Sequence, residues 1–141
     1  MRDIVYEQAL FKHQCDMLAM LNDYSKQNPN QWTRHDLFAI QRVLQIYIES
    51  FIGTARYIVQ QKYQLSVSQS REAIDQLKNH ADLTIEQHKQ LLKIIGFRNV
   101  LVHDYLDIND AIVQAIVIEK QYLLLEHIIT QWREQLNQLS V

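Results

Sequence analysis

The stretch LFAIQRVLQIYIESFIGTARYI, residues 37–58, decides the fold class of this chain. Its apolar residues recur in alternating steps of three and four, the spacing that places side chains on one face of an α-helix. Val43, Ile46 and Ile52 widen the apolar arc, so we expect this helix to be buried on two sides. The residues of the main face are Leu37, Ile40, Leu44, Tyr47, Phe51, Ala55 and Ile58.

Helical patterns continue on both sides of this stretch. Residues 2–26 predict a first helix, which ends before the sequence Asn28-Pro29-Asn30 because proline disfavours a helical residue before it. Its apolar stripe includes Ile4, Phe11, Cys15 and Leu18. We expect Cys15 to be a small buried helix residue, and as the only cysteine it cannot form an intrachain disulfide.

Two capping boxes mark further helix starts. Thr33 with Asp36, and Thr84 with Gln87, have the spacing at which side chain and backbone cap one another at a helix N-terminus. The second box predicts a helix that runs towards His103. We also expect a short helix over residues 71–79 and one long final helix over about 110–138.

Composition agrees with an all-helical protein. The 141 residues include only one proline and two glycines, too few for the turns of a strand-rich fold. We therefore predict an all-α fold, an up-and-down four-helix bundle with an additional short helix, in a single domain spanning residues 1–141. Gly53 and Gly96 fall inside predicted helices, where glycine costs up to about 1 kcal/mol relative to alanine. Each either permits a close backbone approach or is tolerated without a role.

Charge and hydropathy limit the function classes. The formal net charge is −2, which argues against a protein that holds long nucleic-acid duplexes. Residues 78–103, however, carry four positive charges against two negative ones, which leaves room for a local site. No apolar run approaches the roughly 18 to 20 residues of a membrane span, and MRDIVYEQAL has no apolar signal core. We expect a cytoplasmic protein.

The segment GFRNVLVHDYLDIN, residues 96–109, carries the candidate chemistry. Arg98, Asn99, His103 and Tyr105 stand where a predicted helix runs out. Asn99 and His103 share a helix face, whereas Arg98 lies about 140° round from His103. The three side chains converge best if the helix ends close to His103.

These residue types suit cleavage of a phosphodiester without a metal ion. An imidazole can act as base or acid at neutral pH, and a guanidinium can grip two phosphate oxygens. A symmetric homodimer would bring a second imidazole to the same cleft. A structural interpretation remains open: Arg98 would pair with Asp104 or Asp107 while His103 caps the helix C-terminus.

Arg98 and Asn99 are adjacent, His103 follows after three further residues, and Tyr105 after one more. This spacing resembles the signature of the HEPN superfamily in HepT toxins. The segments QRVLQIYIESFIGTARYIV (41–59) and SREAIDQL (70–77) also resemble this family's second and third helices. The resemblance implies a metal-independent endoribonuclease that acts as a homodimer on tRNA or mRNA, without a cofactor. It further implies that Arg98 and His103 are catalytic, with Asn99 supporting them.

The same resemblance implies a protein partner. HepT toxins are neutralised by a minimal nucleotidyltransferase (MNT) antitoxin, which would adenylylate Tyr105 here. From a different function class, the chain could be a non-catalytic HEPN module that docks a nucleotidyltransferase subunit. A helical scaffold without a site is a third interpretation.

Other groups of residues give weaker indications of a functional site. His80 and His88 have no obvious third ligand, so a surface position is favoured over a metal site. Glu49 could orient Arg98 or could be solvated. Four aromatic residues at helical spacing are expected in the core or an interface rather than in a base-stacking platform. They are Tyr47, Tyr57, Tyr63 and Trp132.

Overall fold

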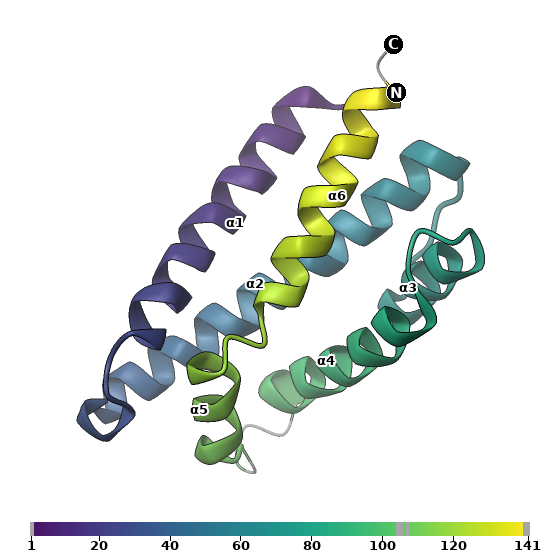
Figure 1. Ribbon diagram of the computed structural model, residues 1–141. Helices are drawn as coiled ribbons and strands as arrows, with labels where there is room; N and C mark the ends of the chain where they lie inside the picture. Colours follow the sequence, from purple (N-terminus) through teal and green to yellow (C-terminus); the bar gives the residue numbers. More distant parts are fainter. Residues whose placement is uncertain (1, 104–105, 107, 140–141) are drawn as a thin grey trace.

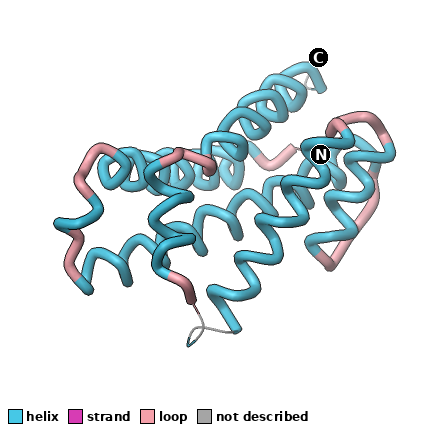
Figure 2. The backbone as a smooth tube through the Cα atoms, turned by 60° about the horizontal axis from the view of Figure 1, so that its bottom comes forward, coloured by secondary structure: helices cyan, strands magenta, loops and turns pink. Residues whose placement is uncertain are grey.

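The computed structural model describes residues 2–103, 106 and 108–139, and every regular element in these segments is a helix (Figures 1 and 2). The all-α prediction is confirmed. The elements are α1 (Ile4–Ser25), the 3₁₀ turn η1 (Pro29–Gln31), α2 (Arg34–Tyr63), α3 (Ser70–Asn79), α4 (Ile85–His103), α5 (Asp110–Ile118) and α6 (Leu123–Leu139).

Helix α2 is the centre of the molecule and packs against every other α-helix. Six of the seven predicted main-face residues, from Ile40 to Ile58, are buried. Val43 and Ile52 are buried as well, which confirms that the helix is covered on two sides. The Thr33 and Asp36 capping box is present, with Asp36 N donating to Thr33 Oγ1 at 3.1 Å and Thr33 N donating to Asp36 Oδ2 at 2.8 Å.

An aromatic contact in the core joins α2 to α6. The rings of Phe51 and Trp132 stack with centroids 5.2 Å apart, and both side chains are buried. Figure 1 shows that α1 begins and α6 ends at the same end of the bundle. There, Arg2 Nη2 lies 3.3 Å from Asn137 Oδ1. Helices α3 and α4 lie together on the other side of α2.

The predicted stripe of α1 was partly wrong. Cys15 and Ile4 are exposed, and the buried positions are Glu7, Phe11, Gln14 and Leu21. The sequence misled because two polar residues face the core. They are buried because both have partners: Gln14, for example, donates to Thr54 Oγ1 on α2 at 2.8 Å.

The prediction of one final helix over 110–138 was also wrong. The chain turns between α5 and α6 at Lys120, whose φ of 55° is left-handed. Lys120 N donates to Val117 O at 3.1 Å and Gln121 N donates to Ile116 O at 3.0 Å, the two bonds of a Schellman C-cap. Neither glycine nor proline marks this turn, so its sequence reads as uninterrupted helix.

No helix in the described part of the chain is long and apolar enough to cross a membrane.

Candidate functional site

Helix α4 carries the candidate residues, and local signals fix where it starts. Gln87 N donates to Thr84 Oγ1 and Thr84 N donates to Gln87 Oε1, both at 3.0 Å, so the second predicted capping box is present. On the side facing the core, α4 buries Leu91, Ile95 and Leu101. These contacts set the rotation of the helix and therefore decide which side chains point to solvent.

Polar contacts anchor α4 to its neighbours. His88 Nε2 lies 2.6 Å from Asp75 Oδ1, which joins α4 to α3. Just before α4, Asp82 accepts hydrogen bonds from Lys62 Nζ and Tyr63 Oη at the end of α2. Burial and the Asp82 carboxylate together raise the pKa of Tyr63, so its hydroxyl stays protonated and donates. Helix α4 is thus held at its N-terminal half.

Arg98 lies on the side of α4 that faces α3. Its Nη2 donates to Ser70 Oγ, at the first residue of α3, over 3.4 Å, and its side chain is half-buried. The Nε atom is buried and has no hydrogen-bond partner among the residues that the structure describes. Because Nε is buried, an anion has to approach the terminal nitrogens of this half-buried guanidinium.

Asn99 and His103 lie on the solvent side of α4. Both are exposed, and His103 is the last residue of the helix. The expectation that the helix ends close to His103 is therefore confirmed. Around the helix axis Asn99 lies between Arg98 and His103, so the three residues form an arc of about 140° at the end of α4. No hydrogen bond joins them to one another within the described residues.

Two predictions fall outside the described residues. Tyr105 lies there, as do Asp104 and Asp107, the proposed acidic partners of Arg98. Glu49 is described: it is exposed on α2 and accepts a hydrogen bond from Gln45 Nε2 at 3.3 Å. The solvated position is therefore the better interpretation of Glu49.

The remaining candidates have structural roles. Tyr47 and Trp132 are buried in the core, and Tyr57 Oη donates to Glu7 Oε2 at 2.5 Å. The His80 ring stacks on Tyr63 with centroids 3.8 Å apart. None of these aromatic side chains forms an exposed platform for bases.

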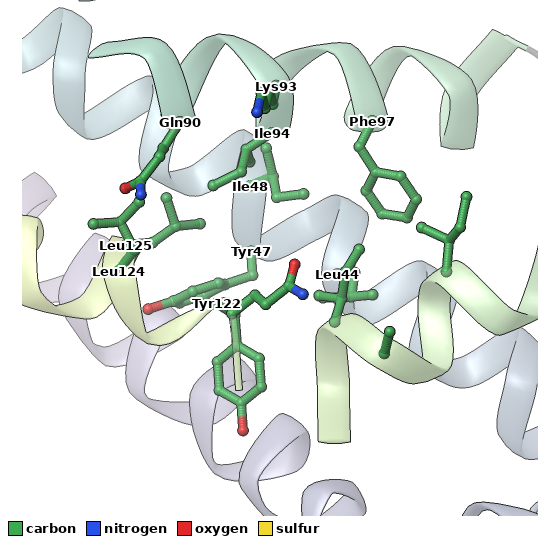
Figure 3. A pocket seen from close by; sticks show the side chains of 14 residues that line it. Leu44, Tyr47, Ile48, Gln90, Lys93, Ile94, Phe97, Tyr122, Leu124 and Leu125 are labelled. Carbon is green, nitrogen blue, oxygen red and sulfur yellow. The ribbon is translucent and has the colours of Figure 1, made fainter. Parts of the chain in front are cut away.

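An open apolar groove, which we did not predict from the sequence, lies beside the site. It lies over α2, between α4 on one side and α5 with the start of α6 on the other, and has a volume of about 500 Å³. Figure 3 shows Ile94 and Phe97 pointing into it from α4, opposite Leu124 and Leu125. Phe97 directly precedes Arg98, so the groove runs next to the candidate site, although Arg98, Asn99 and His103 are not among its lining residues.

The signal for the groove is present in the sequence of α4. Gln90, Lys93, Ile94 and Phe97 follow helical spacing on one face, and all four line the groove. Across the groove, Ile112 on α5 is 50% exposed and adds to the apolar lining.

Comparison with known protein families gives one match, to the family described as HepT-like, ribonuclease HepT-like, over residues 14–131. The chain belongs to this family. The match includes the whole of α2, α3 and α4 and therefore the arc of Arg98, Asn99 and His103. No curated protein is similar enough in sequence to match the chain.

Two solved structures share the fold of this chain. The structure of the cytosolic protein of unknown function YutE from Bacillus subtilis is 19% identical with a TM-score of 0.75, and the match covers 94% of this chain and 91% of that one. A second, described as a toxin–antitoxin crystal structure with AMP-PNP, is 21% identical with a TM-score of 0.71. That match covers 91% of this chain and 99% of the other.

Proposed function

We propose that this chain is the toxin of a HepT/MNT toxin–antitoxin pair and a metal-independent endoribonuclease that acts in the cytoplasm. The observation that carries the proposal is the end of α4. There, exposed Asn99 and His103 lie beside a half-buried Arg98 whose Nε has no partner in the described residues. Membership of the HepT-like ribonuclease family supports it.

The chemistry follows from the residue types. One imidazole takes the proton of the 2′-hydroxyl, whose oxygen attacks the phosphorus as the bond to the 5′-oxygen breaks. A second acid protonates that leaving oxygen, so the products are a 2′,3′-cyclic phosphate and a 5′-hydroxyl end. Arg98 stabilises the charge on the pentacoordinate phosphorus, and Asn99 supports the phosphate from the same arc.

A single chain supplies one His103, so the proposal includes a homodimer. The apolar groove beside α4 is the surface that we assign to the second copy, because it reaches Phe97, next to Arg98. A partner seated there would cover Ile112 and bring a second arc of Arg98 and His103 towards the first. Such a C2 interface uses the same patch on both chains.

We further propose that a cognate MNT antitoxin adenylylates Tyr105. The modification would add bulk and a negative phosphate two residues from His103, where it would compete with an RNA phosphate for Arg98. The likeness to a toxin–antitoxin structure with AMP-PNP supports a nucleotide-dependent partner. Mass spectrometry after co-expression with the antitoxin should show an added AMP on Tyr105, and an unmodified Tyr105 in a fully neutralised toxin would contradict this step.

The test of the nuclease is cleavage of single-stranded RNA by the purified protein in EDTA. We expect cleavage that leaves cyclic phosphate and 5′-hydroxyl ends, and loss of cleavage in His103→Ala with an unchanged helical circular dichroism spectrum. An intact RNA after incubation with wild type would refute the proposal.

The second candidate is a non-catalytic module that docks a nucleotidyltransferase subunit. The open groove favours it, because an apolar surface of this kind also suits a partner protein. Expression of the chain alone separates the two: growth arrest supports the nuclease, whereas a harmless protein that co-purifies with the nucleotidyltransferase supports docking.

A further inference from the structure

Gly96 lies in the middle of α4 on its exposed face, one turn before Asn99. A Cβ atom added there would meet nothing within 4 Å. Glycine weakens a helix interior because it loses more backbone freedom on folding than alanine does. The packing of the chain therefore gives no reason for glycine at position 96, and a close approach by another molecule does.

The surroundings of Gly96 indicate the charge of that molecule. Lys89 and Lys93 are exposed on the same side of α4, two turns and one turn before Gly96 respectively, and Asn99 and His103 continue the same face. The five residues form a continuous stripe, which rises about 21 Å from Lys89 to His103 at about 1.5 Å per residue. We call it the α4 stripe.

Neither lysine forms an ion pair in the part of the chain that the structure describes. Within the described segments no ion pair joins Lys89 or Lys93 to a carboxylate, whereas Lys12 pairs with Asp16 at 3.3 Å and Lys62 pairs with Asp82. Lys89 and Lys93 are one helical turn apart, and at Gly96, the next turn, no side chain covers the backbone. Without an ion pair in the described segments, these two cations favour an extended anion.

We propose that the α4 stripe binds the sugar-phosphate backbone of single-stranded RNA and leads it to His103. Lys89 and Lys93 each neutralise a phosphate, and Gly96 lets the strand lie directly on the helix backbone before it reaches Asn99. The inference rests on the proposed ribonuclease function and adds to it the path of the substrate. It also explains how a chain with a net charge of −2 holds RNA: the cations are concentrated on one helix face.

A second copy of the chain is the less suitable occupant of the stripe. If two α4 helices crossed in parallel at Gly96 around a two-fold axis, Lys93 of each would be brought towards Lys93 of the other, and like charges repel. In an antiparallel crossing each Lys93 would lie towards Asn99 of the other copy, which offers no opposite charge. The apolar face of α4, with Ile94 and Phe97, points instead into the groove (Figure 3). The helix thus has one face for a protein surface and another for a polyanion, and Lys93 lies at the border between them because it also lines the groove.

The experiment measures binding separately from cleavage. The probe is a short single-stranded 2′-O-methyl RNA, which lacks the attacking hydroxyl and cannot be cut, and its affinity is measured by fluorescence anisotropy against the full-length protein. Gly96→Ala should weaken binding about tenfold, roughly the loss of one good contact, while the melting temperature stays the same or rises. Gly53→Ala is the matched control: it removes the other mid-helix glycine, which faces Tyr6 on α1, and should leave RNA affinity unchanged.

Charge variants test the other half of the stripe. The double variant Lys89→Gln/Lys93→Gln should flatten the slope of log affinity against log salt by roughly 1.4, since each phosphate contact on a single strand contributes about 0.7. Lys12→Gln/Lys26→Gln carries the same change in net charge away from α4 and should leave the slope unchanged.

The outcomes separate the stripe from the nuclease. Wild type that binds the probe through the stripe but leaves unmodified RNA intact would refute the proposed function alone. If variants of the α4 stripe bind the RNA probe as tightly as wild type does, the proposal that the stripe binds RNA is wrong, even if wild type cuts RNA. Dissociation of a dimer by Gly96→Ala in sedimentation, with unchanged RNA affinity per site, would show that Gly96 serves a second copy and would also overturn it.

Discussion

Arg98 Nη2 and Ser70 Oγ are 3.4 Å apart, so the side chain that we assign to the phosphate is held by the first residue of α3. The segment SREAIDQL therefore matters to the site as well as to the fold. Ser70 is a positioning residue in this account, because it acts through Arg98 and not on the RNA.

Removal of this hydroxyl should impair turnover without unfolding the protein. We expect Ser70→Ala to lower kcat for RNA cleavage by about three- to tenfold, which corresponds to the net value of one hydrogen bond, about 0.5–1.5 kcal/mol. Ser70→Thr keeps the hydroxyl and should restore the rate. Equal rates for the alanine and threonine variants would show that Ser70 only starts α3.

The groove predicts a charge-sensitive dimer. Ile112 is half exposed at its edge, so Ile112→Glu costs little in the isolated chain but would bury an unpaired carboxylate in the dimer. Sedimentation velocity should show a shift from dimer to monomer, with loss of RNA cleavage and an unchanged melting temperature at low protein concentration. Ile85→Glu changes an exposed residue at the start of α4 and is the control. A dimer that survives Ile112→Glu would place the interface elsewhere.

Glu7 predicts an acid-sensitive contact between the N-terminus, α1 and α2. Arg2 donates to its carboxylate at 2.6 and 3.0 Å, and Tyr57 Oη donates at 2.5 Å, so the Arg2 hydrogen bonds, more than any other contact, lower the pKa of Glu7. A lowered pKa means that the contribution to stability is complete above the ordinary value of 4.5 and is lost as the pH falls below it.

The corresponding variant is Glu7→Gln. At pH 7 it should lower the free energy of unfolding by about 1.5–3 kcal/mol, the range for hydrogen bonds to a charged group. Denaturant unfolding at several pH values should show this difference shrinking below pH 4.5, where Glu7 of the unfolded wild-type chain begins to take up a proton before that of the folded protein does. A difference that stays constant from pH 7 to pH 3 would contradict the assignment.

The buried hydrogen bond between Gln14 and Thr54 gives a stability prediction that is independent of function. Thr54→Val keeps the shape of the side chain but removes the acceptor of Gln14 Nε2, which retains only a 3.3 Å contact to Ser50 O. We expect a loss of about 1–3 kcal/mol in the free energy of unfolding, measured with urea, and no change in RNA cleavage. A neutral effect would mean that Gln14 finds another partner.

The elements with strong local signals were predictable from the sequence. The apolar period of α2 and the capping boxes at Thr33 and Thr84 gave the right helices, because in each case side-chain spacing and backbone capping agree. The end of α4 at His103 was also expected. These features depend on residues that are close in sequence.

The predictions were wrong where residues that are distant in sequence determine which side chains are buried or where the chain turns. Gln14 and Glu7 face the core because Thr54, Tyr57 and Arg2 bind their polar atoms, although Gln14 Oε1 has no partner among the described residues. No local pattern in α1 shows these contacts. The turn after α5 depends on a left-handed Lys120, a conformation for which the sequence holds no glycine. The contact of Arg98 with Ser70 and the groove beside Phe97 likewise need the packing of α3, α4 and α5 around α2.

The most direct test of the central claim is the rate of RNA cleavage by His103→Ala compared with His127→Ala, both in EDTA. His127 is an exposed histidine on α6, so its removal controls for the loss of an imidazole. We predict that His103→Ala is slower than wild type by at least about 100- to 10,000-fold, the usual contribution of a general acid or base, while His127→Ala cuts at the wild-type rate. Cleavage by His103→Ala at the wild-type rate would contradict the assignment of the end of α4 as a ribonuclease site.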